Sequence, residues 1–426
     1  MHECFFSNSH TGLMSTKTKL NQVLISTVKR SKNANSNLEE QHRNSSAVGQ
    51  NVTDRKVIAT DRKLTSVIAA IGTQAAPYSF RQEEVARYMG DMYADNTAAR
   101  KINILSRQSG IHYRQSVIPD FSVGCEKPEL FRYSDIPDVA KRMEIYKSKV
   151  LPIATAAIDN AIEKLNDPAS LEKITHIITV TCTGMYAPGL GIELINHYNL
   201  PANTFHTAIN FMGCNASFAA LRMADLIQQN DQNAMTLVVC VELCTLHFQP
   251  KDNNDNLLAN TLFADGAAAM VITSAGYADQ HKLNGVQIRG FHTLTLNEGS
   301  ELMAWNINPV NFEMVLSSDI PEFIGRNVNY IFKEISQSFK LDNPEDIKWG
   351  IHPGGKRILD EFCKAMNMNN SEIAESYQVL QQHGNMSSVT IIFVLEELLK
   401  KTPPNTQIIT MGFGPGISVE TALLHT

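Results

Sequence analysis

The sequence lacks long hydrophobic runs, basic stretches and paired cysteines, and each absence argues against a class of protein. Apolar runs such as residues 389–395 are far shorter than the ~20 residues needed to cross a bilayer, so no membrane span is expected. The formal net charge of −6 and the absence of a long basic run argue against nucleic-acid binding. The seven cysteines are widely spread, without a C-x-x-C pair or a secretory leader, which predicts reduced thiols and a cytoplasmic location.

What the sequence does contain is typical of a large globular enzyme. Hydrophobic residues make up 43% of the 426 positions and charged residues 19%. Because a single hydrophobic core usually stops growing at ~250–300 residues, we expect two halves, residues 61–285 and 286–426. Residues 1–60 are rich in Ser, Asn, Thr and Lys, and we expect a disordered tail or a linker from a longer polypeptide.

Strand and helix patterns alternate after this tail. Short β-branched runs predict strands at residues 66–72, 174–181, 235–241, 268–273, 347–350, 406–411 and 417–424. Apolar residues spaced by three and four predict helices at residues 82–93, 137–165 (one long helix with a break), 190–198, 216–229, 321–339, 355–367 and 387–401. The alternation predicts an α/β fold with helices on the faces of a sheet.

Cys214 is the cysteine whose surroundings best suit a nucleophile. It follows Gly213 and precedes a strongly helical run, so its sulfur is expected at a helix start. Unpaired N–H groups and the positive end of the helix dipole favour a thiolate there. Taken alone, however, a buried structural cysteine is the more common case.

Two further polar residues lie in glycine loops before expected helices. His352 stands in Gly-Ile-His-Pro-Gly-Gly after a short apolar strand, and Asn385 stands in His-Gly-Asn-Met-Ser-Ser. Each is equally well explained as a turn residue or a helix cap. Together with Cys214, they supply the nucleophile and the two hydrogen-bond donors that thioester condensation needs.

These motifs resemble the chalcone-synthase-like type III polyketide synthases. The His loop at 350–355, the Asn loop at 384–388 and Gly-Phe-Gly-Pro-Gly at 412–416 occur in that family's order and at similar separations. By itself the last loop is a tight turn and a weak phosphate cradle, since no helix follows it. The resemblance, over roughly residues 66–426, implies a thiolase-like five-layered αβαβα fold with two duplicated halves, and a homodimer.

The resemblance also implies the reaction and its residues. Cys214, His352 and Asn385 match the catalytic triad, and Phe263 and Phe312 match two phenylalanines between the pantetheine tunnel and the cavity, although core packing would otherwise explain either Phe. Cys214, kept ionised with the help of His352, would accept an acyl starter. His352 and Asn385 would then bind the malonyl-CoA thioester oxygen during loss of CO₂. Repeated condensation and cyclisation would give a phenol, resorcinol or pyrone, with the thioesters as substrates and no cofactor or metal.

Departures from the family pattern bear on the starter. His247 and Met303 are bulkier than their counterparts in the plant chalcone-forming enzymes, and Cys182 and Ala187 replace other lining residues. Ser387, in the Asn loop, is a further expected lining residue. A narrower cavity favours a medium-chain aliphatic starter over a bulky aromatic one.

A second departure concerns delivery of the starter. Lys101 matches one of the family's basic positions for the CoA phosphates, but Ile104 and Gln108 stand at two others, with Arg107 and Arg114 as the nearest substitutes. Fewer fixed charges should weaken CoA phosphate binding. We therefore expect that an acyl carrier protein can deliver the starter, as in steely-type hybrids of a fatty acid synthase and a polyketide synthase.

Three alternatives differ in the chemistry they predict. A ketoacyl-carrier-protein synthase III uses the same three residue types but performs one condensation. A hydroxymethylglutaryl-CoA synthase would need a catalytic Glu, for which no motif is seen. A non-catalytic thiolase-fold protein would lack part of the triad, whereas Cys214, His352 and Asn385 are all present.

Overall fold

The computed structural model describes residues 65–426 except 94–95, 123, 133–135, 166 and 342–345, so the predicted tail at 1–60 lies outside the described residues. The main feature is a mixed sheet, in which β11/β12, β4/β5 and β4/β6 pair in parallel and the other neighbours are antiparallel. Its nine strands among the described residues follow the order β11 (Lys348–Ile351), β12 (Gln407–Gly414), β13 (Ser418–His425), β8 (Val286–Thr295), β1 (Ser66–Ala75), β7 (Asp265–Ser274), β6 (Thr236–Leu243), β4 (His176–Thr181) and β5 (Phe205–Asn210).

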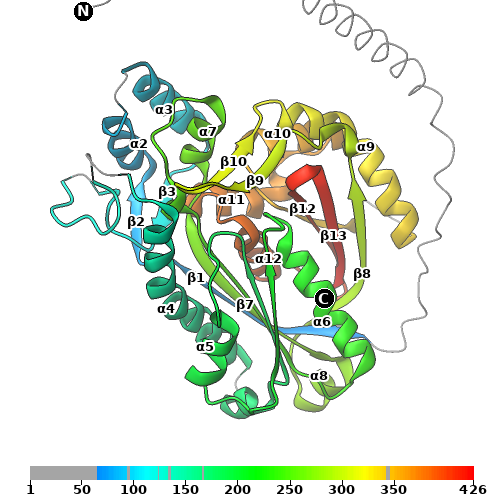
Figure 1. Cartoon of the computed structure of the whole chain (residues 1–426). Coiled ribbons are helices and arrows are strands. Elements are labelled where there is room, and N and C mark those ends of the chain that lie inside the picture. Colours follow the sequence, from blue (N-terminus) through cyan, green and yellow to red (C-terminus); the bar gives the residue numbers. More distant parts are fainter. Residues whose placement is uncertain (1–64, 94–95, 123, 133–135, 166, 342–345) are drawn as a thin grey trace, which may run out of the picture. The chain divides into compact units, whose positions relative to one another are not determined.

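Helices pack on this sheet in three layers (Figure 1). The long helix α4 (Val139–Leu165) covers one face of the β1/β7/β6/β4 part, and α9 (Ile320–Phe339) with α10 (Lys356–Met366) covers one face of the β11/β12/β13 part. Helices α6 (Ala216–Asn230) and α12 (Thr390–Leu399) lie between the two parts of the sheet. The order helix, sheet, helix, sheet, helix gives five layers.

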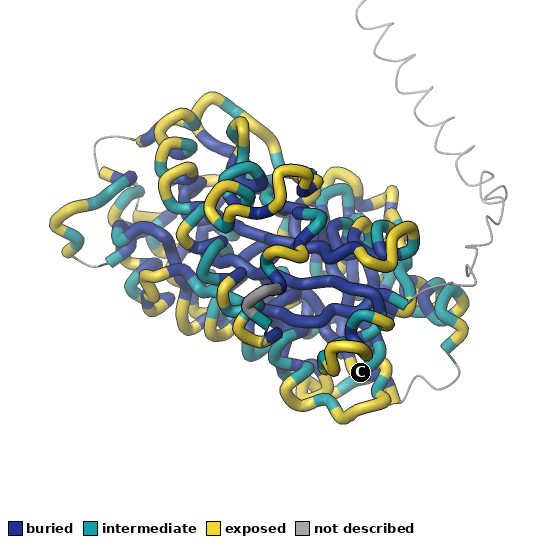
Figure 2. Tube along the Cα trace, turned by 90° about the horizontal axis from the view of Figure 1, so that it is seen from below, coloured by how far each residue is buried: buried dark blue, intermediate teal, exposed yellow. Residues whose placement is uncertain are grey.

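The alternation of side chains along the strands explains this arrangement. In β6, Val239 faces the core under α4, whereas its neighbour Val238 faces the core around α6 and α12. In β12, Ile408 faces the central core and Ile409 the core under α9 and α10. Because successive side chains of a strand point to opposite faces, a strand buried on both faces is apolar at most of its positions. Figure 2 shows these strands as the buried centre of the molecule.

Smaller elements surround the layers. They are α2 (Gln82–Asp91), α3 (Asn96–Gln108), α5 (Leu190–His197), α7 (Asn254–Leu262), α8 (Ala275–His281), α11 (Ala374–His383), the pair β2 (Tyr78–Arg81) and β3 (Tyr113–Ser116), and the hairpin β9 (Met303–Ile307) and β10 (Phe312–Leu316). Among the described residues, no helix is long and apolar enough to span a membrane.

The predicted elements agree with the structure except at a few places. The break expected in the helix at 137–165 is not seen, because α4 runs unbroken through Pro152, held by fully buried neighbours such as Val150 and Ala154. Periodicity predicted no element at ten further places, namely β2, α3, β3, β5, α7, α8, β8, β9, β10 and α11. The boundary expected at 285/286 remains a prediction, since β8, which begins there, pairs with both β1 and β13.

Candidate active site

Cys214 lies in a tight turn between β5 and α6. Phe211 and Gly213 have positive φ angles of 59° and 84°, and a Cβ atom on Gly213 would lie 2.1 Å from Cδ of Pro415. Only glycine therefore fits at position 213. The turn places Cys214 immediately before Asn215, the N-cap of α6, with its side chain almost fully buried.

Burial controls the ionisation of this thiol. Burial, with a smaller contribution from the charge of Glu242, raises the pKa of Cys214 to about 12, although the Ser387 and Asn385 side chains beside the sulfur lower it. Burial likewise lowers the pKa of His352 to about 3. Desolvation therefore opposes the thiolate that the helix start favours at Cys214, and it opposes the imidazolium form of His352.

Asn385 connects the Asn loop to two other parts of the site. Its backbone pairs with the end of α7, since Asn385 N donates to Leu262 O at 2.9 Å and Ala264 N donates to Asn385 O at 2.9 Å. Its side-chain Nδ2 donates to Gly354 O at 3.2 Å, and its Oδ1 accepts from Ser387 N at 2.8 Å. The Asn385 amide is thus fixed between the His loop and Ser387.

His352 follows β11, and its backbone N–H continues the sheet by donating to Met411 O at 2.8 Å. The side chain is 1% exposed, and neither ring nitrogen has a hydrogen-bond partner among the described residues. Its ring lies beside Gly354, since a Cβ atom there would be 3.9 Å from His352 Nε2. Buried polar atoms are nearly always paired, so these two nitrogens are suited to a ligand that arrives from outside.

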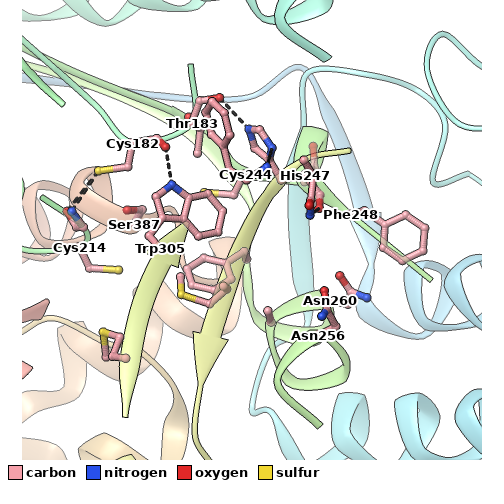
Figure 3. Close-up of a pocket in the computed structure, with 18 of the residues that line it drawn as sticks. Cys182, Thr183, Cys214, Cys244, His247, Phe248, Asn256, Asn260, Trp305 and Ser387 are labelled. Carbon is pink, nitrogen blue, oxygen red and sulfur yellow. Dashed lines mark hydrogen bonds between the residues drawn. The ribbon is translucent and has the colours of Figure 1, made fainter. Parts of the chain in front are cut away.

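Cys214 faces a first cavity with an empty volume of about 740 Å³ (Figure 3). Most of the predicted lining residues are brought together there: Cys182, His247, Phe263, Met303, Phe312 and Ser387. His352 and Asn385 are buried behind the wall rather than lining it. Ala187 is exposed, in a cis peptide bond with Pro188, and does not line this cavity, so its role remains a prediction.

One wall of the first cavity is a fixed group of aromatic rings. His247 stacks on Phe312 with ring centroids 4.5 Å apart, and Trp305 meets both edge-on. His247 Nε2 donates to Thr183 O at 2.7 Å and its Nδ1 accepts from Phe312 N at 3.1 Å, so the imidazole is neutral. Trp305 Nε1 donates to Cys182 O at 2.7 Å, as Figure 3 shows.

A buried carboxylate, Glu242, lies behind Cys182. It accepts hydrogen bonds from Cys182 N at 2.9 Å, Thr183 Oγ1 at 3.0 Å and Ser388 Oγ at 2.6 Å. Burial raises the pKa of Glu242, and these donors lower it. Glu242 therefore joins the loop that carries Cys182 to the Asn loop.

A second cavity, with an empty volume of about 1250 Å³, lies on the other side of α7. The two faces of this helix line different cavities: Asn256, Ala259 and Asn260 face the first, whereas Leu257, Leu258, Thr261 and Leu262 face the second. Lys101 and Gly354 also line the second cavity, but Arg107 is exposed outside it. Arg114 is buried and donates to Asn260 O and Phe263 O, so it does not substitute for a surface phosphate ligand.

Two family models match this chain. The N-terminal domain of chalcone and stilbene synthases matches residues 53–276, and the C-terminal domain matches residues 292–426. The chain belongs to the chalcone and stilbene synthase family. It is a type III polyketide synthase, an acyltransferase that works by decarboxylative condensation, and this membership favours it over a ketoacyl-carrier-protein synthase III.

Relatives of this type III polyketide synthase are distant but cover nearly its whole described length. The alpha-pyrone synthesis polyketide synthase-like Pks18 of Mycobacterium tuberculosis is 26% identical over 358 residues, 83% of this chain and 90% of Pks18. PKS-I from the brown alga Ectocarpus siliculosus superposes with a TM-score of 0.79 at 25% identity, covering 86% of this chain and all of PKS-I. The C-terminal type III domain of Steely1 from Dictyostelium superposes with a TM-score of 0.76 at 25% identity, covering 85% of this chain and 99% of the Steely1 domain. The predicted thiolase-like α/β fold is confirmed.

Several residues of this synthase site had no signal in the sequence. Trp305, Cys244 and Asn256 line the first cavity, and Glu242 supports it from behind. They stand in ordinary strand or helix patterns without a glycine loop. In the described part of the chain, no group of three or more His, Cys, Asp or Glu side chains is placed to hold a metal ion.

Proposed function

We propose that this type III polyketide synthase loads a medium-chain aliphatic acyl group onto Cys214 and extends it with malonyl-CoA. The observation that carries the proposal is the position of the Cys214 thiol, which faces a cavity beside Ser387 and Asn385. In the loading step, sulfur attacks the acyl carbonyl, the bond to the carrier sulfur breaks, and the thiol proton leaves with that sulfur. His352, neutral and without a partner, is the base that moves the proton.

Extension then uses the same three side chains. The malonyl C–C bond to the carboxylate breaks, CO₂ leaves, and the electron pair becomes an enolate whose oxygen accepts hydrogen bonds from Asn385 Nδ2 and from the ring N–H of neutral His352. The enolate carbon attacks the acyl-Cys214 carbonyl, and the Cys214 sulfur leaves with the electron pair. Repeated rounds produce a polyketide that cyclises in the cavity.

The cavity wall supports the proposed starter, and a relative supports the proposed product. His247, Met303 and Trp305 narrow the first cavity, which suits an aliphatic chain better than a bulky aromatic acid. We propose a pyrone or resorcinol as the product, supported for the pyrone by the similarity to Pks18, whose name describes alpha-pyrone synthesis.

We also propose a homodimer. Strand β5 is at the edge of the sheet with unpaired backbone groups, and Phe205 on it is 57% exposed. Met185 and Met212, at 47% and 44%, are exposed too, so a second copy would cover apolar surface. Light scattering after gel filtration measures the mass; a monomer at micromolar concentration would contradict the proposal.

We also propose a cytoplasmic location, because all six cysteines in the described residues are free.

The function is tested by incubating the protein with acyl-CoA starters of six to twelve carbons and malonyl-CoA, followed by mass spectrometry of products and of intact protein. We expect tri- and tetraketide products and an acyl adduct on the protein. Cys214→Ala should fold but carry no adduct and form no product. An undiminished adduct on this variant would show that Cys214 is not the nucleophile, and a single added acetate unit would show that extension is not iterative.

A further inference from the structure

Two cations, Lys356 and Arg357, line the second cavity at positions other than the basic positions of the family on α3. Lys356 and Arg357 are the first two residues of α10, directly after the Gly354–Gly355 loop that continues from His352. On α3, the corresponding wall of the same cavity carries Ile104 and Gln108, which have no charge. The positive charge of this cavity is therefore concentrated at the start of α10, with Lys101 on α3 opposite.

The stability of α10 explains Lys356 only in part, through its i,i+4 ion pair with Asp360, and it does not explain Arg357. The N-terminus of a helix is its positive end, where acidic side chains are favourable and basic ones unfavourable. The first turn of α10 has no acidic residue, and its N-cap, Gly355, offers no side-chain cap. Free backbone N–H groups and two cations at one helix end together favour an anion.

Both side chains are available to a ligand. The Lys356 side chain packs against Gly110, since a Cβ atom built on Gly110 would lie 3.0 Å from Lys356 Cδ. Its ammonium pairs with Asp360 at 2.7 Å and with no other described carboxylate. An ammonium has three donors, so others remain free. The guanidinium of Arg357 makes one long hydrogen bond, from Nη1 to Ser318 O at 3.4 Å, and no ion pair with a described residue.

The second cavity also leads toward the chemistry. Gly354 lines it and lies beside the buried, unpartnered ring of His352. The part of the cavity wall formed by Leu257, Leu258 and Leu262 is apolar. A ligand here would have a reactive end at His352, an extended middle along leucines, and an anion at Lys356 and Arg357.

We propose that Lys356 and Arg357 bind the phosphate next to the pantetheine arm of the incoming thioester. The proposal rests on the proposed function, because it assumes that thioesters reach Cys214 and His352 through the second cavity. This phosphate is present both in CoA and on a carrier protein, so the site accepts either source. In this proposal, Lys356 and Arg357 take over the phosphate-binding role of the two positions on α3 that are occupied here by Ile104 and Gln108.

The test compares two starters that differ by one phosphate, hexanoyl-phosphopantetheine and hexanoyl-pantetheine. The wild type should use the phosphorylated starter about tenfold better in kcat/KM, as expected for two exposed ion pairs. In the double variant Lys356→Gln/Arg357→Gln, that ratio should fall to about one, through KM rather than kcat. The matched control Lys348→Gln/Lys364→Gln removes two exposed cations outside the cavity and should keep the wild-type ratio.

Hexanoyl-CoA and a hexanoyl carrier protein are the remaining two arms. In the double variant, KM should rise for both starters. The wild-type kcat/KM values for the two starters show which one is the preferred source. A double variant that keeps the tenfold ratio, or a wild type without one, would overturn the phosphate site. A wild type that transfers acyl groups from none of the four starters would instead overturn the proposed function.

Discussion

Replacing His247 with glutamine should make the stability of this protein less dependent on pH. Burial lowers the pKa of His247 to about 3, against 6.5 in the unfolded chain. Protonation in the folded state would turn Nδ1 into a donor that faces Phe312 N, which is itself a donor 3.1 Å away. A glutamine side chain can replace both hydrogen bonds of the neutral imidazole, because its NH2 group donates and its carbonyl oxygen accepts, and it does not titrate.

The sign and size follow from linkage. Because the folded pKa is depressed, the unfolded chain takes up a proton below pH 6.5 that the folded protein refuses, so stability falls as pH falls toward 3. Between pH 7.5 and 5.0 this costs the wild type about 2 kcal/mol of unfolding free energy from His247 alone. His352 also contributes to the loss of stability at low pH, but its contribution is the same in the wild type and in His247→Gln and cancels in the comparison.

Urea denaturation at pH 7.5 and at pH 5.0, followed by circular dichroism, measures the difference. We expect the loss on acidification to be smaller in His247→Gln than in the wild type by about 2 kcal/mol. The exposed His281 provides the control, since His281→Gln should retain the wild-type loss. Equal losses in the wild type and His247→Gln would show that His247 is not held neutral, and that the aromatic wall is not fixed as described.

Two further predictions concern the site. Asn385→Ala should lower the rate of malonyl-CoA decarboxylation about 10²-fold, because one donor to the enolate oxygen is lost, while acyl loading on Cys214 remains detectable by intact-protein mass spectrometry; an unchanged decarboxylation rate would remove Asn385 from this role. Trp305→Phe loses the 2.7 Å bond to Cys182 O, so it should cost about 1 kcal/mol in urea denaturation and shift starter use toward longer acyl chains in product analysis; an unchanged chain-length profile would show that Trp305 does not limit the cavity.

The sequence revealed the residues that lie in unusual local patterns. Cys214 after Gly213, and His352 and Asn385 in glycine loops, stand out because tight turns need particular residues. Trp305 and Glu242 could not be found in this way, because they matter through partners distant in the chain: Trp305 bonds Cys182, and Glu242 bonds Ser388.

The same limit applies to the fold and to ionisation. Strands buried on both faces were predictable from continuous apolar runs, but β5 was not, since most of its residues are exposed at the sheet edge. The helix start favoured a thiolate at Cys214 on local grounds. The burial that raises its pKa comes from the packing of the whole site, which no local pattern contains.

In the proposed mechanism, helix α7 connects the cavity that receives the thioester with the cavity that holds the acyl group. Its 3.6-residue period sends Ala259 to the first cavity and Leu258 to the second, so one helix forms a wall of both. At its end, Leu262 lines the second cavity and Phe263 the first, so the two cavities approach each other there. The backbone at this point pairs with Asn385, whose amide holds Gly354 beside His352. The end of α7 therefore brings the His and Asn loops to the place where a thioester in the second cavity would meet the acyl group held in the first.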